Sequence, residues 1–343
     1  MQIKLQFGLK WFLLATTLVA VLAGTVGKRV YDWSQTDFAL ERRTRAIQGL
    51  EEFGAYLERR DEAIVMVSFP DKQAKSRYFR MTAEIEEVED LRLSMTGFRD
   101  ADSPTLAAHP MLRELRLSGN PGVTDKTLKS IARIKSLQML ELAHSNITDE
   151  GLKDVARLPK LRELYLSSTP VTTRGLDHLL PMQSLHRLVL VNTNVDDEGL
   201  AAIGKLRGLR ILDLDKTKVD GPGLVHLAKL PNLMALDLNG CSLQDGSGLA
   251  ELKQVKYLSI CNAQISPGVL SLIHKMENLR DLNLSGSGID DEQLAELANA
   301  KQLTSLSLGN SGGDQTSHAS AAALSALRAK LPNTRIFGEP RDQ

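Results

Sequence analysis

A pattern of apolar residues returns along most of this chain at intervals of about 24 residues. Each copy has the form Leu-x-x-Leu-x-Leu, and the steps between copies are mostly 24 residues, with one of 25 and one of 22. One unit of this length cannot bury its own apolar side, whereas stacked units share a continuous core, so the repeat predicts a solenoid. The copies start at Leu112, Leu137, Leu161, Leu185, Leu209, Leu233, Leu279 and Leu303, with Val88 and Val255 beginning weaker ones.

The spacing inside each copy predicts a short strand followed by a short helix. The alternation in Leu-x-Leu places both leucines on one side of a strand. The apolar residues that follow, such as Leu152, Val155 and Leu158, step by three and suit one face of a helix. Successive strands should form a curved parallel sheet with the helices on its outer side.

Acidic residues recur where these helices should begin, as at Thr148, Asp149 and Glu150. A threonine can cap free backbone N–H groups at a helix N-terminus, and acids favour the positive end of the helix dipole. Acidic triplets stand at the same place in residues 196–198 and 290–292. Because an active site is needed once and a cap in every turn, we interpret these acids as structural.

The chain resembles the leucine-rich-repeat family in its 24-residue form, Leu-x-x-Leu-x-Leu-x-x-Thr-x-Val-Thr-Asp-x-Gly-Leu. The match covers residues 88–337 and about ten copies. The resemblance implies an α/β horseshoe solenoid with a parallel concave sheet and short convex helices. Cytosolic ubiquitin-ligase receptors carry similar repeats behind an F-box, but residues 34–87 contain no Leu-Pro-x-Glu-Ile box, so that role is not carried over.

The N-terminus predicts membrane targeting. Residues 1–10 form a short flank, and residues 11–27 are an uncharged, mostly apolar run bounded by basic residues. Such a run is either a single transmembrane helix or a cleaved signal segment, and we favour the uncleaved anchor. The layout also resembles bacterial membrane-anchored leucine-rich-repeat proteins, which begin with a motif like the FGLK of residues 7–10. We expect the repeats to lie in the cell envelope, with the side of the membrane left open because both flanks are basic.

Residues 28–87 separate this anchor from the repeats. We predict a helix over 36–60, a strand over 63–69 that extends the sheet and closes its N-terminal edge, and a loop over 71–87. The helix could contact anionic lipid or simply cap the repeats, and its nearly balanced charge favours the cap. Residues 309–320 read as a flexible Gly/Ser-rich loop, and residues 338–343 as a tail.

Composition excludes several function classes. The 42 basic and 42 acidic residues cancel, which argues against nucleic-acid binding. Of the two cysteines, Cys241 should lie in the core and Cys261 should face outward, so a disulfide between them is not expected. No nucleophile–base pair or metal set stands out, so we predict no enzyme activity, no catalytic residue, no cofactor and no metal.

The residues between the buried leucines should form the concave face. An apolar window beside an acidic rim there has the composition of a protein-binding hot spot. We therefore expect a protein partner with a basic or amphipathic segment. The alternatives are an envelope protein that binds glycan or cell-wall polymer, and a substrate-recognition subunit of a larger complex. The candidate contact residues are Tyr165, Arg187, Val189, Val191, Ile211, Asp213, Asp215, Asp237 and Tyr257.

Overall fold

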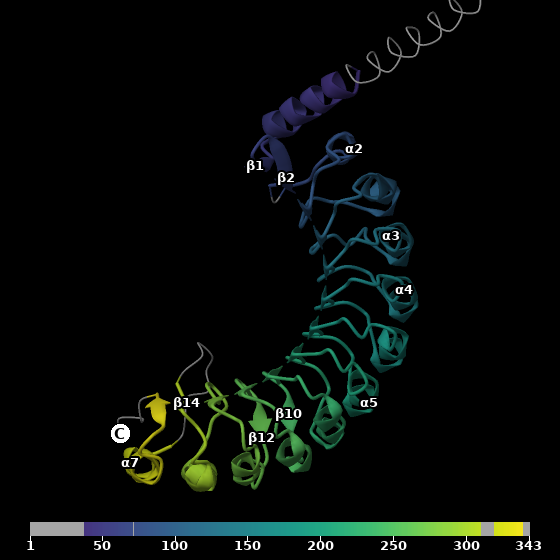
Figure 1. Cartoon of the computed structure of the whole chain (residues 1–343). Helices are drawn as coiled ribbons and strands as arrows, with labels where there is room; N and C mark the ends of the chain where they lie inside the picture. The colour runs from purple at the N-terminus through teal and green to yellow at the C-terminus, as the bar shows by residue number, and fades with distance from the viewer. Residues whose placement is uncertain (1–37, 71, 310–318, 339–343) are drawn as a thin grey trace, which may run out of the picture.

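The computed structural model describes residues 38–70, 72–309 and 319–338, and over these ranges the chain forms an arc (Figure 1). A sheet of short strands lines the inner side of the arc, and short helices cover its outer side. A helix over residues 38–53 stands at one end and α7 stands at the other. This is the α/β architecture that the repeat predicts.

The inner sheet has 13 strands, which follow one another in chain order. All neighbouring pairs are parallel except β1 (Tyr56–Arg60) and β2 (Ala63–Ser68), which form an antiparallel hairpin at the N-terminal edge. The other strands are β3 (Asp90–Arg92), β4 (Glu114–Arg116), β5 (Met139–Glu141), β6 (Glu163–Tyr165), β7 (Arg187–Val189), β8 (Ile211–Asp213), β9 (Ala235–Asp237), β11 (Tyr257–Ser259), β13 (Asp281–Asn283), β14 (Ser305–Ser307) and β15 (Arg335–Phe337).

The outer side mixes α and 3₁₀ helices of at most ten residues. In the two copies around the 22-residue step, β10 (Ser242–Leu243) and β12 (Gln264–Ile265) add a second, two-stranded parallel sheet. The helices are α2 (Ser76–Thr82), η1 (Asp100–Ala108), α3 (Asp125–Ile131), α4 (Asp149–Val155), η2 (Thr173–Leu179), η3 (Asp197–Gly199), α5 (Leu200–Ile203), η4 (Pro222–Lys229), η5 (Ser247–Glu251), η6 (Leu270–Lys275), α6 (Asp291–Glu296), η7 (Leu297–Asn299) and α7 (Ala321–Lys330).

Two predictions in the N-terminal segment are wrong. The helix predicted over 36–60 ends at residue 53, because Gly54 takes a left-handed conformation (φ 92°) that stops a helix, and residues 56–60 pair with β2 instead. The loop predicted over 71–87 contains α2, which is anchored by buried Phe79. The Phe79 ring lies 5.4 Å from that of Phe69 and 5.1 Å from that of Phe98.

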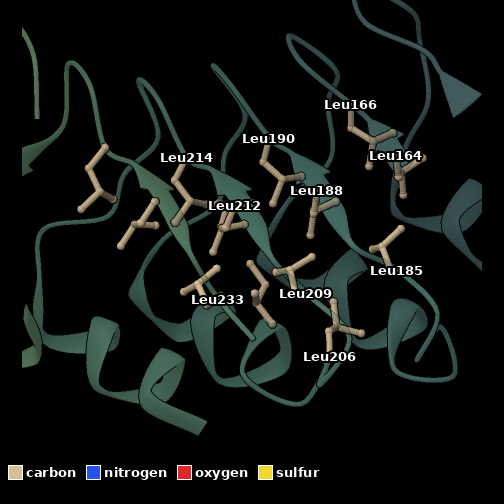
Figure 2. Packing of buried hydrophobic residues seen from close by; sticks show 14 of the residues in the cluster. Leu164, Leu166, Leu185, Leu188, Leu190, Leu206, Leu209, Leu212, Leu214 and Leu233 are labelled. Carbon is tan, nitrogen blue, oxygen red and sulfur yellow. The ribbon is translucent and has the colours of Figure 1, made fainter. Parts of the chain in front are cut away.

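The repeat leucines form one continuous core, with the leucines of neighbouring repeats stacked behind the sheet (Figure 2). The small residue after each Leu-x-Leu has a second role. The buried Thr169, Thr193 and Thr217 hydroxyls each donate a hydrogen bond of 2.6–2.7 Å to the carbonyl three residues earlier. A hydroxyl at this position therefore adds a hydrogen bond to a buried carbonyl at the turn that leaves the strand.

Both cysteines are buried. Cys241 lies in the core, as predicted, and Cys261 faces the inner side of the arc, as predicted, since its Sγ lies 3.3 Å from Ser259 Oγ, but it is covered there. The Asn239 side chain of the neighbouring repeat accepts hydrogen bonds from the Cys261 backbone N–H and from Ser259 Oγ, both at 2.7 Å, and so packs over this part of the strand. Both thiols are free.

Thr148 caps α4 as predicted, since its hydroxyl accepts a hydrogen bond from the Glu150 N–H. The role of Asp149 is different from the one expected. Its carboxylate accepts hydrogen bonds from the backbone N–H and the hydroxyl of Thr172 in the next repeat, at 2.8 and 2.7 Å. Asp125 holds Thr148 in the same way. These acids therefore clamp successive repeats together.

Across the described residues, no helix has the length and apolarity needed to cross a membrane. The predicted anchor, residues 11–27, lies outside the part of the chain that the structure describes.

Candidate binding surface on the concave sheet

The strand register aligns the outward-pointing residues into rows that run along the concave face. The central row passes through Tyr165, Val189, Asp213 and Asp237, which pair with one another from β6 to β9. Arg187, Ile211 and Tyr257 belong to the row two residues earlier, and Val191 and Asp215 come two residues after the central row. The structure thus brings all nine candidate residues onto five adjoining repeats of one face.

The N-terminal part of this face carries a neutralised ionic network. Arg116 lies 2.6 Å from an Asp90 oxygen and 2.8 Å from a Glu114 oxygen. Tyr165 donates a hydrogen bond of 2.6 Å to Glu163, whose carboxylate also lies 3.9 Å from the Arg187 Nε. Burial, together with this hydrogen bond to Glu163, raises the pKa of the Tyr165 phenol to about 12. Both candidates in this part, Tyr165 and Arg187, are therefore tied to Glu163.

The apolar window between Tyr165 and the acids is shallow. Val189 is only 8% exposed, whereas Val191 and Ile211 are half-buried. Tyr257 projects furthest among the candidates and is 50% exposed, next to the small Ala235 in the sheet register. A ligand on this face would contact Ile211, Val191 and Tyr257 rather than Val189.

Three carboxylates lie together on β8, β9 and the turn after β8. Asp213 and Asp237 are direct cross-strand partners, and Asp213 accepts a hydrogen bond from the Asp215 N–H at 3.1 Å. Asp215 in turn accepts hydrogen bonds from the backbone and side-chain N–H groups of Asn239, at 2.8 and 2.9 Å. Within the described parts of the chain, none of the three forms an ion pair.

This acidic cluster, Asp213, Asp215 and Asp237, is electrostatically unfavourable as it stands. Burial, and then the charges of Asp215 and Asp237, raise the pKa of Asp213 to about 6. Burial and the Asp215 charge also raise the pKa of Asp237, although the nearby Arg187 charge partly opposes them. The cluster would be stabilised by a cationic group placed over it.

We expect Asp213→Asn to raise the free energy of unfolding by about 1 kcal/mol at pH 7.5 and to leave it unchanged near pH 4. The native pKa lies above the unfolded value of about 3.9, so the native state binds the proton more tightly. The stability that this proton contributes is complete below the unfolded pKa and is lost as pH rises through about 6. Water screens part of this effect because the carboxyl is only half-buried.

Urea denaturation of both proteins at the two pH values measures this difference. The matched control is Asp281→Asn, which removes a carboxylate of the same face whose cross-strand neighbours, Tyr257 and Ser305, are uncharged. Equal stability of Asp213→Asn and the parent at pH 7.5 would contradict the electrostatic strain assigned to the cluster.

No group of three or more His, Cys, Asp or Glu side chains is arranged to hold a metal ion in the part of the chain that the structure covers. In the acidic cluster, the Asp215 carboxylate is already occupied by Asn239. The arrangement offers charge and shape for recognition.

Two exposed rings on this face were missed from the sequence. Tyr56 on β1 and Phe337 on β15 are 63% and 53% exposed, and the register places both in the central row, at opposite ends of the sheet. Tyr56 lies within residues 36–60, which were predicted to be helical, and so it was not expected on the sheet. Phe337 lies after the last Leu-x-x-Leu-x-Leu copy, which starts at Leu303, so the repeat pattern does not mark it.

A family model described as a leucine-rich repeat region matches residues 92–331. The chain belongs to the leucine-rich-repeat family. Solenoids of this kind bind partners on their extended concave surfaces. The family therefore agrees with the face on which the candidate residues gather.

Several solved structures are similar to this leucine-rich-repeat protein. Internalin C2 of Listeria monocytogenes is 27% identical over 57% of this chain and 80% of its own, with a TM-score of 0.47. A leucine-rich-repeat protein of Leptospira interrogans is 17% identical over 80% and 75%, also at 0.47. A second L. monocytogenes internalin is 18% identical over 90% and 95%, at 0.41. No curated protein matches the chain.

Proposed function

We propose that this chain is a non-enzymatic, membrane-held recognition module that binds a basic segment of a protein partner on its concave face. The observation that carries the proposal is the acidic cluster, in which Asp213, Asp215 and Asp237 lie half-buried and without an ion-pair partner among the described residues. A lysine or arginine of a partner would relieve this repulsion. The interaction between the two opposite charges would be stronger once binding removed water from around them.

The surroundings of the cluster suit an amphipathic segment. Ile211 and Val191 adjoin the acids on one side, and the exposed ring of Tyr257 lies on the other. An apolar anchor beside a charged group is the usual composition of the energetically dominant part of an interface. Membrane attachment through residues 11–27 rests on their uncharged, apolar sequence.

The test is chemical crosslinking from native membranes, with the full chain and its Asp213→Lys/Asp237→Lys variant as baits. We expect a protein that the parent captures to be lost at least about tenfold from the variant, because two attractive charges become repulsive. Circular dichroism and the thermal midpoint verify that the variant keeps its fold. The matched control is Glu198→Lys/Glu292→Lys, which makes the same charge change at two exposed sites on the convex side.

Equal capture by all three baits would contradict recognition by the acidic cluster. The glycan alternative requires exposed rings lined up for stacking on sugars. Tyr56, Tyr257 and Phe337 lie instead on β1, β11 and β15, at separate places along the sheet, so we favour a protein ligand. Retention of the parent on a cell-wall polysaccharide column, unaffected by the two aspartate changes, would reverse this preference.

A further inference from the structure

A basic groove lies at the N-terminal end of the solenoid, between the helix over residues 38–53 and α2. Four arginines line it, two from each helix, together with Glu84, Ala46 and Met81: Arg42, Arg45, Arg77 and Arg80. The two helices are in contact at Gly49, where an added Cβ would lie 2.9 Å from the Met81 thioether. The fold therefore joins basic residues more than thirty positions apart in sequence.

The arginines of this groove are incompletely neutralised. Arg42 lies 3.6 Å from Glu84, and Arg45 lies 3.1 Å from Glu41, in pairs that are exposed and therefore weak. Arg77 stacks on the Tyr78 ring at 4.6 Å and donates a hydrogen bond to its hydroxyl. The Arg80 guanidinium has no hydrogen-bond or ion-pair partner in the described ranges. Arg77 and Arg80 thus remain available to an anion.

An apolar tip adjoins the groove. Phe38 is 60% exposed and Leu40 is 59% exposed, in the first turn of the helix over residues 38–53. Phe38 precedes Arg42 by four residues and Arg45 by seven, which places the ring and both arginines on one helix face. Exposed apolar side chains beside a cluster of basic ones are typical of a surface that lies in the headgroup region of a membrane.

We propose that this groove binds phosphate groups of anionic phospholipids through Arg77 and Arg80, with Phe38 placed among the headgroups. The guanidinium fork matches the geometry of phosphate oxygens. The helix over residues 38–53, which lines the groove, begins eleven residues after the predicted anchor, residues 11–27, so it can reach the surface of the same bilayer within about 40 Å of extended chain. That the phosphate belongs to a lipid rests on the membrane attachment proposed above. Lipid binding by this groove would place the N-terminal end of the arc against the bilayer.

The experiment uses the full chain in neutral dodecyl maltoside micelles, titrated with phosphatidylglycerol or with phosphatidylcholine. Hydrogen–deuterium exchange of residues 38–53 and of α2 is the readout. We expect phosphatidylglycerol to slow exchange in both helices and phosphatidylcholine to leave it unchanged. Arg77→Gln/Arg80→Gln should raise the phosphatidylglycerol concentration needed for half of this effect about tenfold.

A second basic groove provides the matched control. Lys129→Gln/Arg133→Gln removes the same charge from the groove between α3 and α4, and should leave the lipid effect intact. Equal protection by both lipids, or an unchanged titration of the arginine variant, would overturn the proposal. The same protection by inorganic phosphate at equal concentration would overturn the lipid as the source of the phosphate. Carbonate extraction of native membranes tests the anchor separately, because micelles present lipid to the groove whether or not residues 11–27 span a bilayer.

Discussion

Replacing Asn120 by alanine is expected to lower the free energy of unfolding by about 3 kcal/mol. Asn120 is fully buried at the position that a small hydroxyl residue occupies in most other repeats. Its amide nitrogen donates to the carbonyls of Leu93 and Leu117, both at 2.8 Å, and its oxygen accepts from the N–H groups of Gly97 and Phe98. Alanine would remove all four hydrogen bonds and leave the Leu117 carbonyl and the Phe98 N–H buried without a partner, whereas the Leu93 carbonyl keeps its hydrogen bond from the Thr96 hydroxyl.

Urea unfolding followed by circular dichroism measures this loss. The matched control is Asn146→Ala in the next repeat, where the amide is exposed and donates to the Pro121 carbonyl. We expect a loss below about 0.5 kcal/mol there, as for an ordinary surface substitution. If Asn120→Ala were no more destabilising than Asn146→Ala, the bridge between the first two repeats would not matter for stability.

Asp149→Ala should lower the free energy of unfolding by about 2 kcal/mol, because it removes two charge-assisted hydrogen bonds between repeats. The carboxylate holds the Thr172 N–H and hydroxyl. Gly175 in the same turn makes room for it, since a Cβ there would collide with the Asp149 carboxylate. The Asp-x-Gly-Leu part of the repeat therefore has one explanation: the aspartate reaches forward, and the glycine of the next repeat lets it approach.

Glu150→Ala is the control for this prediction. Glu150 is an acid in the same helix turn, but it is exposed and pairs with Lys153 on the surface. Its removal should leave the thermal and urea midpoints unchanged within error. A similar effect of the two substitutions would indicate that helix-dipole stabilisation, to which both acids contribute, outweighs the clamp.

The periodic part of the fold could be predicted because each repeat solves the same packing problem. The leucine spacing gave the strand positions, their parallel order and the inward side chains. The N-terminal segment has no such repetition. Residues 56–60 look helical locally, and only their pairing with β2 makes them a strand. Similarly, the polar sequence around α2 conceals Phe79, whose burial depends on the distant rings of Phe69 and Phe98.

The concave face was predicted less completely than the core. The alternation of leucines with other residues along each strand predicts which side chains point outward. It does not predict how exposed they are, since Val189 is almost covered and Tyr257 is not. The clamp by Asp149 had a signal in the sequence that was overlooked. An aspartate precedes a threonine by 23 residues at Asp125 and Thr148 and again at Asp149 and Thr172, and this spacing is one repeat less one residue.

Binding of the captured partner to the neutral Asp213→Asn/Asp237→Asn variant tests most directly whether the acidic cluster recognises a basic segment. These changes keep the size of both side chains and remove their charge. We predict affinity about tenfold weaker than that of the parent protein, and a smaller loss of affinity between 50 and 500 mM salt. Equal affinity and equal salt dependence of the two proteins would contradict the proposed recognition and place the binding site elsewhere on the solenoid.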